Sequence, residues 1–185
     1  MPSEHNRLLD MPGHLVRRLQ QISVALFMEQ ARDFDITPVQ YAALVAIEKR
    51  PGLDQTALCN IIAFDRSTIG DVVGRLERKK LIRRMSGAVD RRTKALYLTS
   101  VGRRLLRQIE PVVQSAQSLI LAPLRASERN AFMQMLRHLV HLNNGHSRAP
   151  QRLKETRSNR AARERAPRRR GPRRWRRQTV RREGR

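Results

Sequence analysis

The chain has 185 residues, and its 39 Lys and Arg against 16 Asp and Glu give a formal net charge of +23. This length fits one domain, or one domain with an extension, and no segment approaches the roughly 18 consecutive apolar residues of a membrane helix. One cysteine excludes an internal disulfide or a cysteine-cluster zinc site. Because the amino terminus has no apolar export signal, we expect a cytoplasmic protein without membrane attachment. The strong positive charge indicates a polyanionic partner.

The composition changes near Gly145. The segment 148–185 holds 17 basic and 3 acidic residues, three prolines and very few apolar residues. Such a segment cannot bury enough apolar surface to offset the entropy that ordering it would cost. We therefore predict that 148–185 is a disordered arginine-rich tail and that 1–147 forms the folded domain.

Within 1–147, the apolar residues recur mostly at helical spacing. Leu15, Leu19, Ile22 and Leu26 form a stripe at i, i+4, i+7 and i+11, which predicts a first amphipathic helix. Similar stripes and helix-start residues follow along the chain. The predicted helices span about 12–32, 38–50, 54–62, 67–80 and 100–121, and a last helix begins after a cap at Ser127.

A β-hairpin is predicted between the fourth and fifth helices. The segments 81–85 and 94–98 have strand character, and the polar, glycine-bearing stretch 86–92 joins them. The long helix that follows is capped by Thr99, and Pro111 within it is expected to cause a bend. The sequence therefore predicts a mainly α fold with one small β-hairpin.

The helices 54–62 and 67–80 are separated by four residues, which is the spacing of a helix-turn-helix. Small and polar residues at the start of the second helix, including Ser67 and Thr68, would let it enter a major groove closely. Helix pairs at this spacing also occur in proteins that bind no DNA. The polar face of the second helix presents Ser67, Gly70, Asp71, Gly74, Arg75 and Arg78.

The hairpin beside this helix pair is basic. An arginine at the tip of such a wing can enter the narrow, electronegative minor groove. The stretch 66–107 carries 13 basic and 3 acidic residues, whereas the rest of 1–147 carries 9 basic and 10 acidic residues. This placement of charge predicts a winged helix-turn-helix that binds double-stranded operator DNA. The cations of the hairpin are Arg83, Arg84, Arg91, Arg92 and Lys94.

The segment 58–99 resembles the winged-helix core of MarR-type transcriptional regulators, and a weaker resemblance extends over 9–144. It implies a winged helix-turn-helix in 37–99, with dimerisation helices in 12–35 and 100–145, and hence a homodimer. The apolar stripes of the first and last helices also favour a dimer, unless they pack within one chain. The matching residues are Asp65-Arg66-Ser67-Thr68-Ile69, Leu76-Glu77-Arg78-Lys79, Asp90-Arg91-Arg92 and Leu96-Tyr97-Leu98-Thr99.

The same resemblance implies roles for individual residues. Arg92 would enter the minor groove, with Asp90 bracing it and Arg91 beside it, and Arg75 would lie against the DNA backbone. The chain departs from the family at Gly70 and Asp71, where the recognition helix of the family often has Thr and Arg. Asp71 can accept a hydrogen bond from a cytosine amino group, but its charge repels phosphate.

Regulators of this family typically release DNA when a small aromatic acid or phenol binds between the dimer region and the DNA-binding region. The candidate anchors here are His14, Arg17 and Arg18, of which His14 and Arg18 lie on one face of the first helix. The segment 9–27 resembles repressors of nicotinic acid catabolism in Bordetella-like bacteria. That resemblance implies a hydroxylated nicotinate, such as 6-hydroxynicotinate, as effector. Alternatively, both arginines are ordinary surface charges and His14 is only a helix-start residue.

The basic tail also fits functions other than operator binding. The main alternative is a non-specific nucleic-acid-binding protein that acts through the basic tail, and another is association of the tail with an anionic membrane or RNA. The sequence holds no motif that predicts an enzyme or a cofactor. Cys59 is expected to be a buried structural cysteine rather than a redox sensor. No metal site is predicted, although His138 and His141 are three residues apart on one helix.

Overall fold

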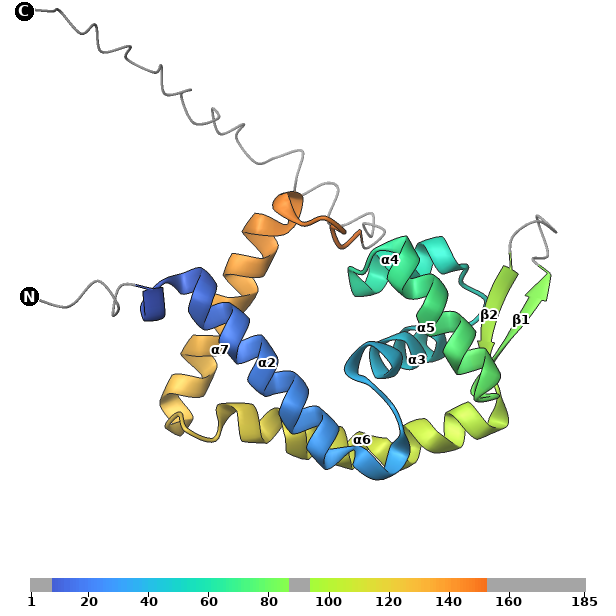
Figure 1. Ribbon diagram of the computed structural model, residues 1–185, viewed down its shortest axis with the longest axis horizontal. Coiled ribbons are helices and arrows are strands. Elements are labelled where there is room, and N and C mark those ends of the chain that lie inside the picture. The colour runs from blue at the N-terminus through green and yellow to red at the C-terminus, as the bar shows by residue number, and fades with distance from the viewer. Residues whose placement is uncertain (1–7, 87–93, 153–185) are drawn as a thin grey trace, which may run out of the picture. The chain divides into compact units, whose positions relative to one another are not determined.

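The computed structural model describes residues 8–86 and 94–152. The chain divides into two units, Met1–Leu153 and Lys154–Arg185, of which the second lies outside the described residues, as does most of the predicted hairpin loop. The described part is mainly helical with one two-stranded hairpin, which confirms the predicted fold class (Figure 1). The elements are α2 (Pro12–Gln30), η1 (Arg32–Phe34), α3 (Pro38–Lys49), α4 (Gln55–Ile62), α5 (Arg66–Arg78), β1 (Ile82–Ser86), β2 (Lys94–Leu98), α6 (Ser100–Leu121), α7 (Ala126–Asn143) and η2 (Asn144–His146).

Side-chain caps determine where four of the helices begin. An oxygen just before each helix accepts a backbone N–H from its first turn, which would otherwise have no partner inside the helix. At α3, Gln40 also reaches back to the backbone N–H of Thr37 and completes a capping box. The cap distances are 3.3 Å at Thr37, 2.7 Å at Asp54, 2.9 Å at Asp65 and 3.0 Å at Thr99.

The start of the last helix was predicted wrongly. Helix α7 begins at Ala126, and Ser127 lies inside its first turn instead of capping it. The carboxylate of Glu128 accepts the backbone N–H of Arg125 at 2.8 Å and also pairs with the Arg125 guanidinium. This pairing places the start of α7 two residues earlier than a cap at Ser127 would.

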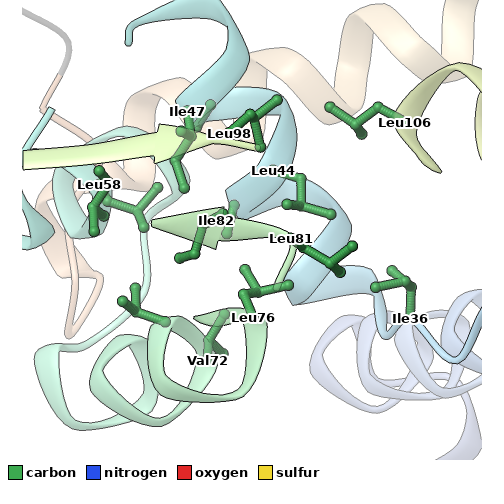
Figure 2. Close-up of a cluster of buried hydrophobic side chains, with 14 of the residues drawn as sticks. Ile36, Leu44, Ile47, Leu58, Val72, Leu76, Leu81, Ile82, Leu98 and Leu106 are labelled. Carbon is green, nitrogen blue, oxygen red and sulfur yellow. The ribbon is translucent and has the colours of Figure 1, made fainter. Parts of the chain in front are cut away.

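The hydrophobic core lies between α3, α4, α5 and the hairpin. Leucines and isoleucines from these elements point toward one another in Figure 2, and most have almost no exposed surface. They come from segments that are distant in the sequence, so the core fixes the recognition-type helix α5 against the hairpin. The fully buried side chains include Leu44, Ile47, Leu58, Ile69, Leu76 and Leu96.

The hairpin strands pair antiparallel, with Ile82 opposite Leu98 and Ser86 opposite Lys94. On its other edge, β2 is held by the residues just before α4. The Gly52 N–H donates to the Leu96 carbonyl and the Leu96 N–H donates to the Leu53 carbonyl, both at 2.9 Å. Gly52 has a φ of +86°, a left-handed conformation that glycine adopts without strain. The hairpin is therefore tied to the loop that leads into α4.

At the junction between the hairpin and α6, Gly102 lies closer to another backbone segment than any other described glycine does. The Thr99 hydroxyl donates to the Lys80 carbonyl at 2.7 Å, and the Thr99 N–H donates to the Leu81 carbonyl at 3.0 Å. A Cβ placed on Gly102 would lie 2.1 Å from the Leu81 carbonyl oxygen. Only a residue without a side chain fits at this position.

Helix α6 runs from this junction and packs along α2 (Figure 1). It continues through Pro111 as one helix. Helices α2 and α7 leave much apolar surface open, and α7 has no buried residue at all. None of the described helices combines the length and the apolar character needed to cross a membrane. The exposed apolar side chains include Leu15, Val16 and Ile22 on α2 and Met135, Leu139, Val140 and Leu142 on α7.

The junction predicts opposite effects of alanine at two helical glycines. In Gly102→Ala, the new Cβ meets the Leu81 carbonyl, so we expect the free energy of unfolding to fall by about 1–3 kcal/mol. In the matched variant Gly74→Ala, no atom lies within 4 Å of the new Cβ. The higher helix propensity of alanine should therefore raise the free energy of unfolding by about 0.5–1 kcal/mol. Urea unfolding measures both, and a neutral Gly102→Ala would contradict the junction.

The cap of α5 predicts a pH dependence. Hydrogen bonds from the Thr68 backbone N–H and the Ser67 hydroxyl lower the pKa of Asp65 from 3.8 to about 2. A carboxyl with a lowered pKa stabilises the fold above its unfolded pKa, and this stability is lost as pH falls through the folded pKa. Asp65→Asn should therefore melt below the parent at neutral pH, with a gap that narrows between about pH 4 and pH 2. A pH-independent gap would contradict this.

Candidate DNA-binding surface and effector sites

The helix-turn-helix is built from α4, α5 and a three-residue turn. Ala63 takes a left-handed conformation with a φ of +57°, which ends α4 and turns the chain. Asp65 then caps α5 and binds two groups with one oxygen, the Ser67 hydroxyl at 2.7 Å and the Thr68 N–H at 2.9 Å. The chain therefore changes from extended to helical at Asp65, and the positive end of the α5 dipole lies at the surface.

Helix α5 separates its buried face from an exposed polar face. Ile69, Val72, Val73 and Leu76 are buried, whereas Ser67, Asp71, Arg75 and Arg78 are exposed and Thr68 is half-buried. The structure therefore places the four candidates Ser67, Thr68, Asp71 and Arg75 on one element. Ser67 is partly committed to the Asp65 cap, so its hydroxyl oxygen is left to accept a hydrogen bond.

The two glycines of α5 do not serve the packing of the domain. Nothing lies within 4 Å of a Cβ built on Gly74, and only the Gln55 amide, at 3.4 Å, lies near one built on Gly70. Each glycine costs up to about 1 kcal/mol of helix stability relative to alanine. The result is a low, half-buried strip beside the row formed by Asp71 and Arg75.

The hairpin brings further cations beside α5. Arg84 Nε lies 3.1 Å from Glu77 Oε2, which ties β1 to α5, and the Arg83 guanidinium lies over the Tyr97 ring at 5.9 Å. These contacts hold two of the wing arginines at the base of the hairpin. The candidates Asp90, Arg91 and Arg92 lie outside the described residues.

The three candidate effector anchors all lie on α2. Arg17 and Arg18 are exposed, and Arg17 donates to Gln21 Oε1 at 3.1 Å. His14 is half-buried, and its Nε2 atom is buried without a hydrogen-bond partner among the described residues. A buried imidazole nitrogen without a partner loses the hydrogen bond that water would give it.

A cleft that the sequence did not indicate lies between α2, α3 and α6. Its volume is about 520 Å³, and it contains none of the three candidate anchors. Phe27 and Tyr41 form a tilted aromatic pair with ring centres 6.0 Å apart. The residues that line it are Phe27, Pro38, Tyr41, Glu110, Val113, Gln114, Gln117, Ser118 and Leu121.

The polar centre of this cleft is a short hydrogen bond. The Tyr41 hydroxyl donates to Glu110 Oε2 at 2.6 Å, and Gln114 donates to Glu110 Oε1 at 3.1 Å. The hydrogen bond from Tyr41, and to a smaller extent that from Gln114, lowers the pKa of Glu110. Burial, and to a smaller extent the hydrogen bond to Glu110, raises the pKa of Tyr41. Tyr41 and Glu110 are 69 residues apart, and no local motif marks the pair.

Two contacts connect this region to α5. Lys79, just after α5, donates to the Asp35 carbonyl and lies 2.8 Å from Asp35 Oδ2. Asp35 ends η1 in a left-handed conformation and leads into α3. These contacts therefore join the segment between η1 and α3 to the end of α5.

Cys59 is buried in the core on α4. Burial raises the pKa of the thiol, partly offset by Arg66, which disfavours the reactive thiolate. Within the described ranges, no three His, Cys, Asp or Glu residues are grouped in a way that would hold a metal ion.

Comparisons with known proteins agree with this geometry. The family model described as "MarR family" matches residues 34–93. The transcriptional regulator HosA of Escherichia coli is 32% identical over 127 residues, which cover 69% of this chain and 93% of HosA. The HTH-type transcriptional repressor NicR of Pseudomonas putida is 32% identical over 128 residues, covering 69% of this chain and 81% of NicR.

A solved structure extends the comparison. It concerns the regulation of DNA binding of Bordetella bronchiseptica BpsR by 6-hydroxynicotinic acid; it has a TM-score of 0.67 and 28% identity, and covers 70% of this chain and 93% of that one. The winged helix-turn-helix, its exposed basic face and these relatives together place the chain among transcriptional regulators, and it belongs to the MarR family.

Proposed function

We propose that the chain is a homodimeric repressor that binds a pseudo-palindromic operator and releases it when a small aromatic acid binds. The observation that carries this proposal is the exposed face of α5, which holds Arg75 and Arg78 beside a basic hairpin while its other face is buried. The relative NicR is a repressor, which supports repression as the outcome.

The uncovered apolar faces of α2 and α7 support the dimer. Leu15 is 52% exposed, and Leu139 and Leu142 are 56% and 64% exposed. A second copy that packs against these faces would remove them from water, and each Å² of apolar surface buried in this way stabilises the dimer by about 25 cal/mol. Two winged helices related by a two-fold axis would then read half-sites about one helical turn apart. The proposed dimerisation segments are 12–35 and 100–145.

In this proposal, the α5 residues and the wing divide the work of binding DNA. Ser67 and Thr68 contact phosphates or base edges at the start of α5, and Arg75 contacts a phosphate further along. Asp71 accepts a hydrogen bond from a cytosine amino group, which the low strip at Gly70 and Gly74 brings within reach. In the wing, Arg92 enters the adjacent minor groove, with Asp90 bracing it and Arg91 beside it.

The DNA-binding proposal predicts two distinguishable defects. The probe is a duplex that the full chain selects from a random-sequence library. Arg92→Ala should weaken binding to the selected duplex about 10–100-fold and relax its sequence preference, because a base-reading contact is lost. Arg75→Ala should weaken binding to all duplexes alike and lower the salt slope by about one per protomer.

Two controls accompany this experiment. Arg50→Ala removes an exposed arginine that lies outside α5, the hairpin and the proposed dimerisation segments, and it should leave both quantities unchanged. Deletion of 148–185 separates the rival function. If that deletion abolishes all binding and Arg92→Ala has no effect, the chain is a non-specific nucleic-acid binder that acts through its tail.

We also propose that the effector is an aromatic carboxylate, with 6-hydroxynicotinate as the first candidate, anchored by His14, Arg17 and Arg18. The unpartnered Nε2 of His14 supports this site, as does Arg18 one turn further along α2. The α2–α3–α6 cleft suits the carboxylate less well, because the ionised Glu110 lies at its centre. The relative BpsR, whose DNA binding 6-hydroxynicotinic acid regulates, supports the ligand class.

Release then follows from differential binding. The effector binds the arrangement in which the two α5 helices are splayed, and it lowers DNA affinity by its preference for that arrangement. The contacts between Asp35 and Lys79 carry a shift of α2 and η1 to the end of α5.

The effector site is tested by thermal shift with 6-hydroxynicotinate and related aromatic carboxylates. A ligand at a hundred times its Kd should stabilise the parent by about 2.7 kcal/mol. We expect His14→Ala to lose this stabilisation and Tyr41→Phe, the matched change in the cleft, to keep it. The reverse result would overturn the His14 site and assign the ligand to the cleft.

A further inference from the structure

The residues that follow α7 fold back onto the helix-turn-helix. We call the segment 147–152 the C-terminal strap. Asn144 closes the loop before it, since its Nδ2 donates to the Gln151 carbonyl at 3.1 Å and its Oδ1 accepts the Gln151 N–H at 2.8 Å. Ala149 and Pro150 are half-buried. The strap is thus a defined loop and reaches α4 (Figure 1).

The strap binds the carboxyl end of α4. Gln151 Nε2 donates to the Ile61 carbonyl at 2.7 Å, and the Arg152 N–H donates to the Asn60 carbonyl at 2.9 Å. The last carbonyls of a helix have no partner inside it, so these two bonds satisfy groups that the fold leaves open. The same end of α4 leads through Ala63 into the amino end of α5.

The chain therefore leaves the strap beside the turn of the helix-turn-helix. Without these bonds, the residues after 152 would be tethered to the end of α7, which lies outside the winged helix. The residues from 154 to 185 include 15 Lys and Arg and 3 Asp and Glu. In HosA, 93% of the protein corresponds to 69% of this chain, so almost a third of this chain has no counterpart there.

We propose that the strap is an anchor that directs the arginine-rich extension onto DNA phosphates flanking the site bound by the winged helix. This inference rests on the proposed DNA-binding function. Anchoring the extension next to DNA raises its effective concentration there, and each phosphate that it neutralises releases counterions. The gain is independent of base sequence in the flanks, because only backbone charge is contacted.

The test compares the full chain on two duplexes. One contains only the selected site, and the other carries the same site with constant flanks on both sides. The parent should bind the flanked duplex more tightly and with a steeper salt slope. Asn144→Ala opens the strap loop and should lose about three- to tenfold of this preference. The neighbouring variant Asn143→Ala should keep it, because the Asn143 side chain donates to the Leu139 carbonyl within α7.

A second pair of variants isolates one backbone bond. Arg152→Pro removes both the side-chain charge and the N–H that donates to Asn60, whereas Arg152→Ala removes the charge alone. The anchor predicts that Arg152→Pro loses more of the flank preference than Arg152→Ala does. Binding to the short duplex should be unchanged in both Arg152 variants, which also shows that they fold. Asn143 and Asn144 lie in a proposed dimerisation segment, so for their variants the flank preference is taken as the ratio of the two affinities of one variant, in which a change common to both duplexes cancels.

The outcomes separate this inference from the function on which it rests. If the full chain selects no duplex, the proposed operator binding fails. If it binds the short duplex normally but Asn144→Ala and Arg152→Pro keep the parent's flank preference, the strap is no anchor and the inference is overturned. Absence of any flank preference in the parent would overturn it as well.

Discussion

The junction at Leu81 is the constraint on which the rest of the domain depends. At this junction the start of α6 is hydrogen-bonded to the backbone of the two residues that connect α5 to the hairpin. Thr99 bonds to the Lys80 and Leu81 carbonyls, and Gly102 allows α6 to approach within a distance that excludes any Cβ. Because α6 in turn packs along α2, α6 connects the DNA-binding elements to the helix that carries the proposed effector anchors.

Charge is distributed along this system in two functionally different portions. The stretch 66–107 holds 13 basic and 3 acidic residues on α5, the hairpin and the start of α6. Short-range contacts, such as Arg84 with Glu77, fix some of these cations in place, which suits the geometric demands of reading a groove. The second portion, beyond residue 153, suits a sequence-independent attraction to phosphates, which in our proposal the strap directs to the flanks of the operator.

Much of the site was accessible from local sequence. The helix 67–80 was predicted with Ser67, Asp71 and Arg75 on its polar face, and in the structure the opposite face is the buried one. The α2–α3–α6 cleft was not accessible, because Tyr41 and Glu110 meet across 69 residues. The strap was not predicted for a similar reason, since Gln151 bonds to the Ile61 carbonyl on α4, which is 90 residues away in the sequence.

The sequence by itself determined the helix periods, the caps, the hairpin and the position of the charge, because these depend on neighbours within a few residues. It did not locate the true start of α7, where Glu128 reached back to Arg125. The tertiary structure alone decided which carbonyls, rings and carboxylates came together at the Leu81 junction, in the cleft and under the strap. Those contacts join distant segments, and only the packing of the buried core determines their spacing.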